Sequence, residues 1–322
     1  MENSHIEWTD HTWNPWIGCT KVDTLCTHCY AETRDIRFAD GAHWGKGAPR
    51  QRTAAGNWRE PYRWNRAAVD AALKHREAFE AEATAYDGAS FTPLPAPRVF
   101  CASLADWLDD EVPLEWLADA LHVIDQNRNL SWLLLSKRPQ NWRPRLTAVA
   151  EMLKGGALGP RRMIEEWLGG RPPEHVWMGT SVGDQKSADT RIPLLLEIPA
   201  IRRFLSCEPL LGPVEFSNVT RRSDCVAQLG KKALNGIDWV IAGGESGKDA
   251  RPMHPKWARS LRDQACAAGV SFLFKQWGEW APLFDATASP LHIFPDGEKV
   301  FRVGKKSAGR ELDGRKWDEI PA

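Results

Sequence analysis

The segment WNPWIGCTKVDTLCTHCY, residues 13–30, begins with a short apolar run and continues into a polar loop that carries three of the chain's seven cysteines. We expect Thr12–Ile17 to form a short strand and Ala31–Ala39 to form a helix. A strand, a loop and a helix in this order make up the unit from which parallel sheets are built. The cysteines therefore lie in a loop beyond the carboxyl end of a strand.

The same alternation of short apolar runs and helical stretches continues along the chain. The expected strands are Arg98–Ser103, Ser131–Ser136, His175–Ser181, Ile201–Ser206, Asp238–Gly243 and Val270–Lys275. The expected helices are Pro113–Asn127, Pro139–Lys154, Arg161–Leu168, Arg191–Glu197 and Pro255–Ala268. About seven such units predict an α/β fold, namely a partial or open (β/α) barrel with parallel strands, rather than a doubly wound sheet.

Two segments depart from this alternation. Residues 40–65 are rich in Gly, Pro, Arg and Trp, which predicts a loop that is a candidate lid, and Asn65 then begins a helix that ends near Tyr86. We therefore expect residues 1–276 to form the barrel, with an Arg/Trp-rich insertion at about 40–97. Residues 277–322 carry two turn signals, Asp296-Gly297 and Asp313-Gly314, and predict a small appended C-terminal element.

Composition excludes some classes of protein. The chain has 322 residues, is 43% hydrophobic and has a formal net charge of zero, so it can bury a large core and has no global charge that favours a nucleic acid or a membrane. No apolar run approaches the ~20 residues that a membrane helix needs. Three clustered and four scattered cysteines do not resemble a secreted disulfide framework, which favours a reducing, cytoplasmic location. The 17 tryptophans suit a stacking surface or a broad hydrophobic cleft, with many buried or half-buried indoles as the alternative.

The spacing C-x6-C-x2-C carries the main chemical signal. Cys19, Cys26 and Cys29 suit ligation of three irons of a [4Fe–4S] cluster, with the fourth iron left open. The alternative is a structural zinc site with a histidine as fourth ligand. His28 is poorly placed for that role because it is adjacent to Cys29, whereas His5, His11 and His43 could fold in.

The cysteine loop resembles that of the radical S-adenosylmethionine (radical SAM) enzymes, whose usual pattern is C-x3-C-x-aromatic-C. The first gap here is six residues, and His28 occupies the aromatic position, which in that superfamily lies against the adenine. More narrowly, five motifs resemble the phage-associated three-cysteine-motif proteins. They are WNPWIGC (13–19), LSKRP (135–139), DWVIAGGES (238–246), ARP (250–252) and FKQWG (274–278).

The resemblance implies a [4Fe–4S] cluster, S-adenosylmethionine and polar binding residues at the carboxyl ends of the strands. By position, Ser103 and Asp106 would bind the methionine amino group, and Thr180 and Ser181 the ribose. Gly243, Gly244 and Glu245 form the Gly-Gly-Glu motif that binds the amino group in the superfamily, but here they follow about the sixth strand and would contact substrate or cofactor. Helix capping is the alternative role for such residues.

Four further strand-end residues are candidates for the chemistry itself. Cys101 and Cys207 suit a hydrogen donor or a thiyl relay, with inert buried thiols as the alternative, and Glu208 and Lys275 suit substrate orientation or a salt bridge at the barrel mouth. The expected function is hydrogen abstraction by a radical SAM enzyme from an unidentified substrate, with nucleic acid or a nucleotide as the candidate and a partner protein also considered. The alternatives are a base-lesion repair lyase and a non-catalytic zinc- or nucleic-acid-binding module.

Overall fold

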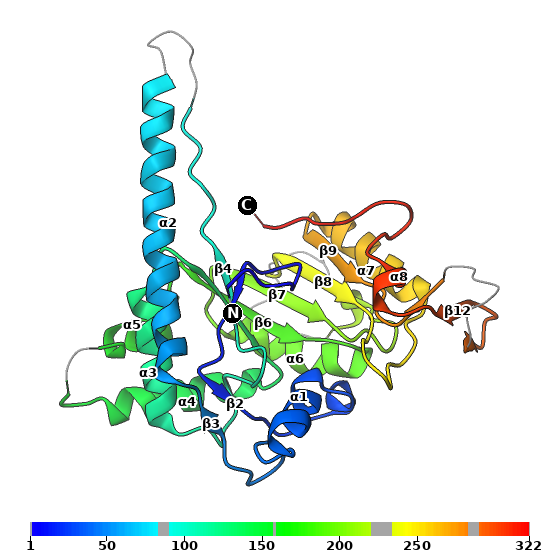
Figure 1. The fold of residues 1–322 in the computed structure, drawn as a ribbon, viewed down its shortest axis with the longest axis horizontal. Helices are drawn as coiled ribbons and strands as arrows, with labels where there is room; N and C mark the ends of the chain where they lie inside the picture. Colours follow the sequence, from blue (N-terminus) through cyan, green and yellow to red (C-terminus); the bar gives the residue numbers. More distant parts are fainter. Residues whose placement is uncertain (1, 83–89, 157–158, 220–233, 283–289, 322) are drawn as a thin grey trace.

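A computed structural model describes residues 2–82, 90–156, 159–219, 234–282 and 290–321. Its centre is a seven-stranded, entirely parallel sheet in the order β1-β4-β5-β6-β7-β8-β9, curled into an open half-barrel (Figure 1). The strands are β1 (His11–Thr12), β4 (Arg98–Cys101), β5 (Ser131–Ser136), β6 (Val176–Ser181), β7 (Arg202–Cys207), β8 (Trp239–Gly243) and β9 (Ser271–Gln276). Because each strand lies beside its predecessor in this sheet, the predicted α/β partial barrel is confirmed.

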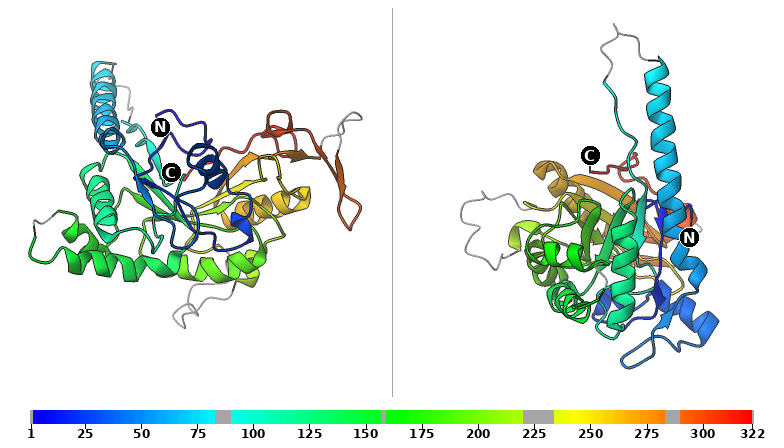
Figure 2. Two further views of the ribbon diagram at one scale, coloured as in Figure 1. Left: turned by 60° about the horizontal axis from the view of Figure 1, so that its bottom comes forward. Right: turned by 90° about the vertical axis from the view of Figure 1, so that its left-hand side faces the viewer.

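Helices cover the outer side of the curled sheet, as two further views show (Figure 2). They are α3 (Leu114–Gln126), α4 (Trp142–Met152), α5 (Arg161–Leu168), α6 (Gln185–Glu197) and α7 (Pro255–Ala268), with 3-10 turns η2 (Pro139–Asn141) and η3 (Phe216–Asn218). Helix α6 begins earlier than expected because Asp184, its N-cap residue, and Ser187, in its first turn, form a reciprocal capping box.

Alternate residues of each strand point to opposite faces of the sheet and pack into two apolar layers, as the two-residue period of a strand requires. Leu134, Met178 and Val240 pack into the large core under the helices, whereas Leu133, Trp177 and Trp239 join a second cluster on the inner face. Trp8 completes that inner cluster from the N-terminal segment. The inner face of the half-barrel is therefore filled by aromatic side chains below the carboxyl ends of its strands.

All 17 tryptophans are buried or half-buried. Trp132, for example, is fully buried and its indole N–H donates to the Asn127 carbonyl at 3.1 Å. The tryptophan-rich composition thus builds the core, and the alternative of an exposed tryptophan stacking surface is wrong.

The insertion differs from its prediction. Strand β3 (Gln51–Arg52) pairs antiparallel with β2 (Trp16–Ile17), and helix α2 then runs over Ala55–Glu82, so the expected loop up to Asn65 is wrong. Pro61 lies inside α2 and cannot donate to the carbonyl of Asn57, which would be its helical partner. The indole N–H of Trp13 donates to that carbonyl instead, at 3.0 Å, so the core supplies the missing bond.

Helix α2 projects from the body of the protein (Figure 1). Its 28 residues give a length of about 42 Å. None of the helices within the described ranges has the combination of length and apolarity that crossing a lipid bilayer requires.

The predicted first strand is divided in two, because Pro15 lies between β1 and β2. The C-terminal residues form a small antiparallel sheet of β10 (Trp280–Ala281), β12 (Lys299–Arg302) and β11 (Leu291–Ile293), followed by α8 (Lys305–Ala308). Asp296-Gly297 is the turn between β11 and β12, and Asp313-Gly314 lies between the bridged residues Leu312 and Arg315, so both turn signals are confirmed.

Substitution of Gly179, in the middle of β6, tests the packing of the inner face. A Cβ atom there would lie 2.3 Å from the ring of the buried Phe204. We expect Gly179→Ala to lower the free energy of unfolding by about 1–3 kcal/mol, as overpacking of a core does. Urea denaturation followed by tryptophan fluorescence measures this, with Gly212→Ala as control because its Cβ would be in ordinary contact, 3.4 Å from Asp184. Equal stability of the two variants would contradict the packing described.

Candidate functional site

The cysteine loop is built from a strand, a 3-10 turn and a helix start. Gly18 follows β2 with φ +112°, and a Cβ atom there would lie 2.4 Å from the carbonyl oxygen of His43, so the close approach of the two segments requires glycine. The turn η1 (Thr24–Cys26) is capped by Asp23, whose carboxylate accepts from the Leu25 N–H at 2.9 Å. Cys29 is the N-cap residue of α1 (Tyr30–Ala39).

Cys19, Cys26 and Cys29 line one cavity of about 100 Å³. The loops after β4 and β5 and the end of β6 complete its wall, which places the cavity at the carboxyl-terminal edge of the sheet, as predicted. Its strand-end lining residues are Ala102, Ser103, Ala105, Asp106, Leu135, Ser136, Lys137, Arg138 and Ser181. Within the described part of the chain, no three His, Cys, Asp or Glu side chains converge closely enough to hold a single metal ion.

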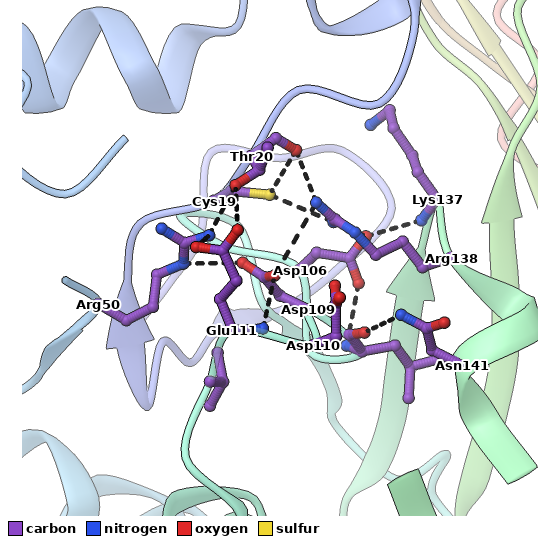
Figure 3. A network of polar contacts seen from close by, with 12 residues as sticks. Cys19, Thr20, Arg50, Asp106, Asp109, Asp110, Glu111, Lys137, Arg138 and Asn141 are labelled. Carbon is purple, nitrogen blue, oxygen red and sulfur yellow. Dashed lines mark hydrogen bonds and ion pairs between the residues drawn. The ribbon is translucent and has the colours of Figure 1, made fainter. Parts of the chain in front are cut away.

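A buried charge network fastens the Cys19 end of the loop to the sheet (Figure 3). Arg138 lies 3.1 Å from Asp106, and it donates to the Thr20 carbonyl at 2.6 Å and to the Cys19 sulfur at 3.4 Å. Asp106 also accepts from the Ser136 hydroxyl at 2.6 Å. One guanidinium therefore connects the end of β5, the loop after β4 and the first cysteine.

Arg50 forms the second half of the network and comes from the insertion. Its side chain and that of Asp109 are both fully buried, with Nε 2.8 Å from the carboxylate. It also donates to the Thr20 hydroxyl at 2.8 Å and to the carbonyls of Gly45 and Ala48. The segment before β3, expected as part of a lid, is thus fixed to the loop after β4 by a buried ion pair and to Thr20 of the cysteine loop by a hydrogen bond.

The chemistry of Cys19 follows from this setting. Burial raises the pKa of its thiol to about 12, Asp106 adds to the rise, and the nearby Arg138 opposes it. Cys19 is therefore a protonated thiol at neutral pH in the ligand-free protein. A metal that binds it must displace that proton.

The Gly-Gly-Glu motif lies against the opposite end of the cysteine loop. Gly244 passes so close to the backbone of Trp277 that a Cβ atom would lie 1.9 Å from its carbonyl oxygen. Glu245 is buried and contacts the Arg251 guanidinium, 2.5 Å away, and Nδ1 of His28, 3.1 Å away. Arg251 also donates to the Thr24 carbonyl at 2.9 Å, so the motif and the loop are joined through two contacts.

The family model described as "Protein of unknown function (DUF5131)" matches residues 3–321, which is nearly the whole chain. The chain belongs to this family. No curated protein and no solved structure matched it.

The remaining predicted binding residues also lie at the carboxyl-terminal edge of the sheet, but they differ in their hydrogen-bond partners. The Thr180 hydroxyl donates to the Ser136 carbonyl at 2.7 Å, and Ser103 exchanges hydrogen bonds with Asn14. Ser181 is buried, lines the cavity and leaves its hydroxyl oxygen without a hydrogen-bond partner. Of these residues, Ser181 is thus the buried one with a free polar atom at the cavity wall.

The four candidates for the chemistry separate into two pairs. Cys101 and Cys207 are buried in the core on the helix side of the sheet, and burial raises the pKa of both thiols. Lys275 lies 3.1 Å from Glu208, and Gly243 leaves room for that carboxylate because a Cβ atom would lie 2.8 Å from it. The second pair therefore forms a salt bridge at the mouth of the half-barrel.

Sequence reasoning missed Arg50, Asp109 and Glu111. Arg50 and Glu111 both contact the Thr20 hydroxyl, and Asp109 pairs with Arg50. Two signals were present. Arg50 lies in the Arg/Trp-rich insertion, and the acidic run Asp109-Asp110-Glu111 follows an expected strand end. Only the fold brings the two segments together.

Arg138→Leu tests the charge network. We expect the variant to lose about 3–5 kcal/mol of unfolding free energy, because Asp106 would remain buried without its guanidinium partner. The matched control is Arg162→Leu, whose side chain is 83% exposed and pairs with Glu166 on a helix surface, so about 1 kcal/mol or less is expected. Urea denaturation of both variants measures the difference, and similar losses would contradict the network's importance.

Glu245→Gln tests the link between the Gly-Gly-Glu motif and the loop. Burial by itself would raise the pKa of Glu245, but hydrogen bonds from Arg251 and His28 outweigh it, so the pKa lies below its ordinary value. The carboxylate therefore stabilises the fold above the unfolded-state pKa of about 4.3, and this contribution is lost as pH falls through the lower folded-state pKa.

We accordingly expect Glu245→Gln to be less stable than the wild type at neutral pH, with the gap closing as the pH falls through the lowered folded-state pKa of Glu245. Urea denaturation across this range measures it, and Glu115→Gln, at an exposed position, is the control. A stability gap that stays constant with pH would show that the carboxylate charge is not responsible.

Proposed function

We propose that this protein is a radical SAM enzyme that binds a [4Fe–4S] cluster through Cys19, Cys26 and Cys29 and abstracts hydrogen from a substrate. The observation that carries the proposal is that the three thiols line one cavity at the carboxyl-terminal edge of a parallel half-barrel. When bound, such a cluster supplies the electron that cleaves S-adenosylmethionine to a 5′-deoxyadenosyl radical. A cytoplasmic location accords with this chemistry, since a reducing compartment preserves the thiols.

The donor set fits this group. Each cysteine of such a site binds a different iron, so the three sulfurs surround a cluster rather than converge on one ion. Arg138, 3.4 Å from the Cys19 sulfur, offers a charge-assisted hydrogen bond to the deprotonated ligand. Hydrogen bonds to the sulfurs are among the features that set the potential of iron–sulfur clusters.

Lys137 and Ser181 are the residues best placed to orient a polar ligand in the cavity. Both line it, and Lys137 points away from the carboxylates of the charge network (Figure 3). Among the described residues, no carboxylate lies within 4.0 Å of its ammonium group. An unpaired cation and an unpartnered buried hydroxyl beside the thiols suit the carboxylate and hydroxyl groups of S-adenosylmethionine.

The cavity must widen to take this ligand. Its volume of about 100 Å³ is below the ~300–1,000 Å³ of typical ligand pockets. The Cys19 end of the loop is held by buried ion pairs, whereas Arg251, at the other end, is 28% exposed. We infer that loading displaces the segment around Cys26 and Cys29 and leaves Cys19 in place.

The zinc alternative is less well supported. None of the histidines considered as a fourth ligand is among the lining residues of the cavity. His43 pairs with Asp35 at 2.8 Å, His28 contacts Glu245, and His11 stacks on Trp64 at 4.4 Å between ring centroids. A structural zinc site that uses one of these three histidines would require its side chain to leave that partner.

Metal loading after anaerobic reconstitution tests the proposal. We expect about four iron and four sulfide per chain and absorption near about 400 nm. Cys19→Ala, Cys26→Ala and Cys29→Ala should each lose most of the iron, while Cys266→Ala, at an exposed cysteine outside the cavity, should retain it. Dithionite and S-adenosylmethionine should then yield 5′-deoxyadenosine with the wild type.

Two outcomes would overturn the proposal. A colourless protein with stoichiometric zinc would identify a structural site. A loaded cluster that gives no 5′-deoxyadenosine would exclude the enzyme class.

A further inference from the structure

Helix α1 carries an exposed aromatic and cationic surface beside the cysteine cavity. Tyr30, Arg34, Arg37 and Phe38 are spaced at positions i, i+4, i+7 and i+8, which share one face of a helix. We call this face the α1 platform. It begins at Tyr30, which lines the cavity and whose hydroxyl donates to the Ser103 carbonyl.

Phe38 is the most exposed large apolar side chain in the described part of the protein, at 71%. Its exposure contrasts with that of the 17 tryptophans, none of which is exposed. The guanidinium carbons of Arg37 and Arg34 lie 5.2 Å and 5.7 Å from the centre of its ring. These are cation–π distances, so the ring and the two cations form one unit.

The charges of the platform are not neutralised by the protein. Among the described residues, no carboxylate lies within 4.0 Å of the guanidinium groups of Arg34 and Arg37. The two acidic residues within α1 are engaged elsewhere, Glu32 with Lys21 at 2.7 Å and Asp35 with His43. The exposed Asp40, at the C-cap, is the next acidic residue along the chain after these two. The platform therefore presents free positive charge next to an exposed ring.

We propose that the α1 platform binds single-stranded nucleic acid and leads it to the cysteine cavity. Arginines that contact phosphates and an aromatic ring on which a base stacks are the combination that binds single strands. A duplex hides the faces of its bases within the stack, so it cannot use the ring of Phe38 in this way. The distance from Phe38 to Tyr30 along the helix is about 12 Å, which is the length of about three stacked nucleotides.

The assignment of the bound strand as substrate rests on the proposed function, whereas strand binding itself does not. The exposed ring of Phe38 lies at one end of the α1 platform and the cavity mouth lies at the other. A bound strand would therefore run along α1 from Phe38 towards the thiols. A base stacked on Phe38 would place a nucleotide about three positions along the strand at Tyr30 and the thiols. The substrate class inferred for the site is therefore a nucleotide within a single strand.

Fluorescence anisotropy with labelled single-stranded DNA and RNA of about twelve nucleotides tests the platform. Phe38→Ala should weaken binding about five- to a hundredfold, as the loss of one stacking contact does. Combined Arg34→Gln and Arg37→Gln should weaken binding and reduce the slope of log K against log salt by about 1.4, as the loss of two phosphate contacts predicts. Ile293→Ala is the control, because this exposed residue of β11 lies outside α1.

Three results would overturn the inference. They are unchanged binding by Phe38→Ala, equal losses in Phe38→Ala and Ile293→Ala, and a duplex that binds as tightly as the single strand. Preferential binding of wild-type protein to anionic vesicles, abolished by the same variants, would assign the surface to a membrane and also overturn it.

The same binding assay on Cys26→Ala separates this inference from the proposed function. Retained strand binding without iron is expected for this variant, because the platform lies outside the thiols. A wild-type protein that binds strands but never binds iron would refute the proposed cluster and leave the platform established. Platform variants that bind iron normally and lose strand binding would support the inference itself.

Discussion

The position of the cysteine loop depends on buried pairing between arginine and aspartate. Arg50 with Asp109 and Arg138 with Asp106 are removed from water, and each member of such a pair would be strongly destabilising without the other. The four residues come from the insertion and from the loops after β4 and β5. Their pairing therefore compels three segments, far apart in the chain, to meet at Thr20 and Cys19.

Because of this pairing, the two halves of the cysteine loop differ in how firmly they are held. The Cys19 half is fixed by charges that solvent does not reach. The Cys26 and Cys29 half is held by contacts nearer the surface, including Arg251 with Glu245 and Arg191 with Asp23. Because partly solvated ion pairs contribute less than buried ones, the second half is the one that can move at low energetic cost.

The agreement and disagreement with sequence-based expectation have clear physical causes. The strands were predictable because β5, β6 and β8 are buried on both faces and appear as continuous apolar runs. The start of α2 was not, because Pro61 and the surrounding Arg and Trp residues indicate a loop by their local propensities. The Trp13 indole satisfies the carbonyl that Pro61 leaves free, and that contact is made from 44 residues away.

The sequence by itself determined the parallel half-barrel, the placement of three cysteines beyond a strand end and the polar character of the neighbouring strand ends. These features follow from local periodicity and spacing, which act over a few residues. The tertiary structure alone decided which polar residues face the thiols and that the tryptophans are core residues. It also decided that Arg50, from the insertion, holds the cysteine loop in place. Those outcomes depend on desolvation and charge pairing between segments distant in the chain, and no local pattern encodes such contacts.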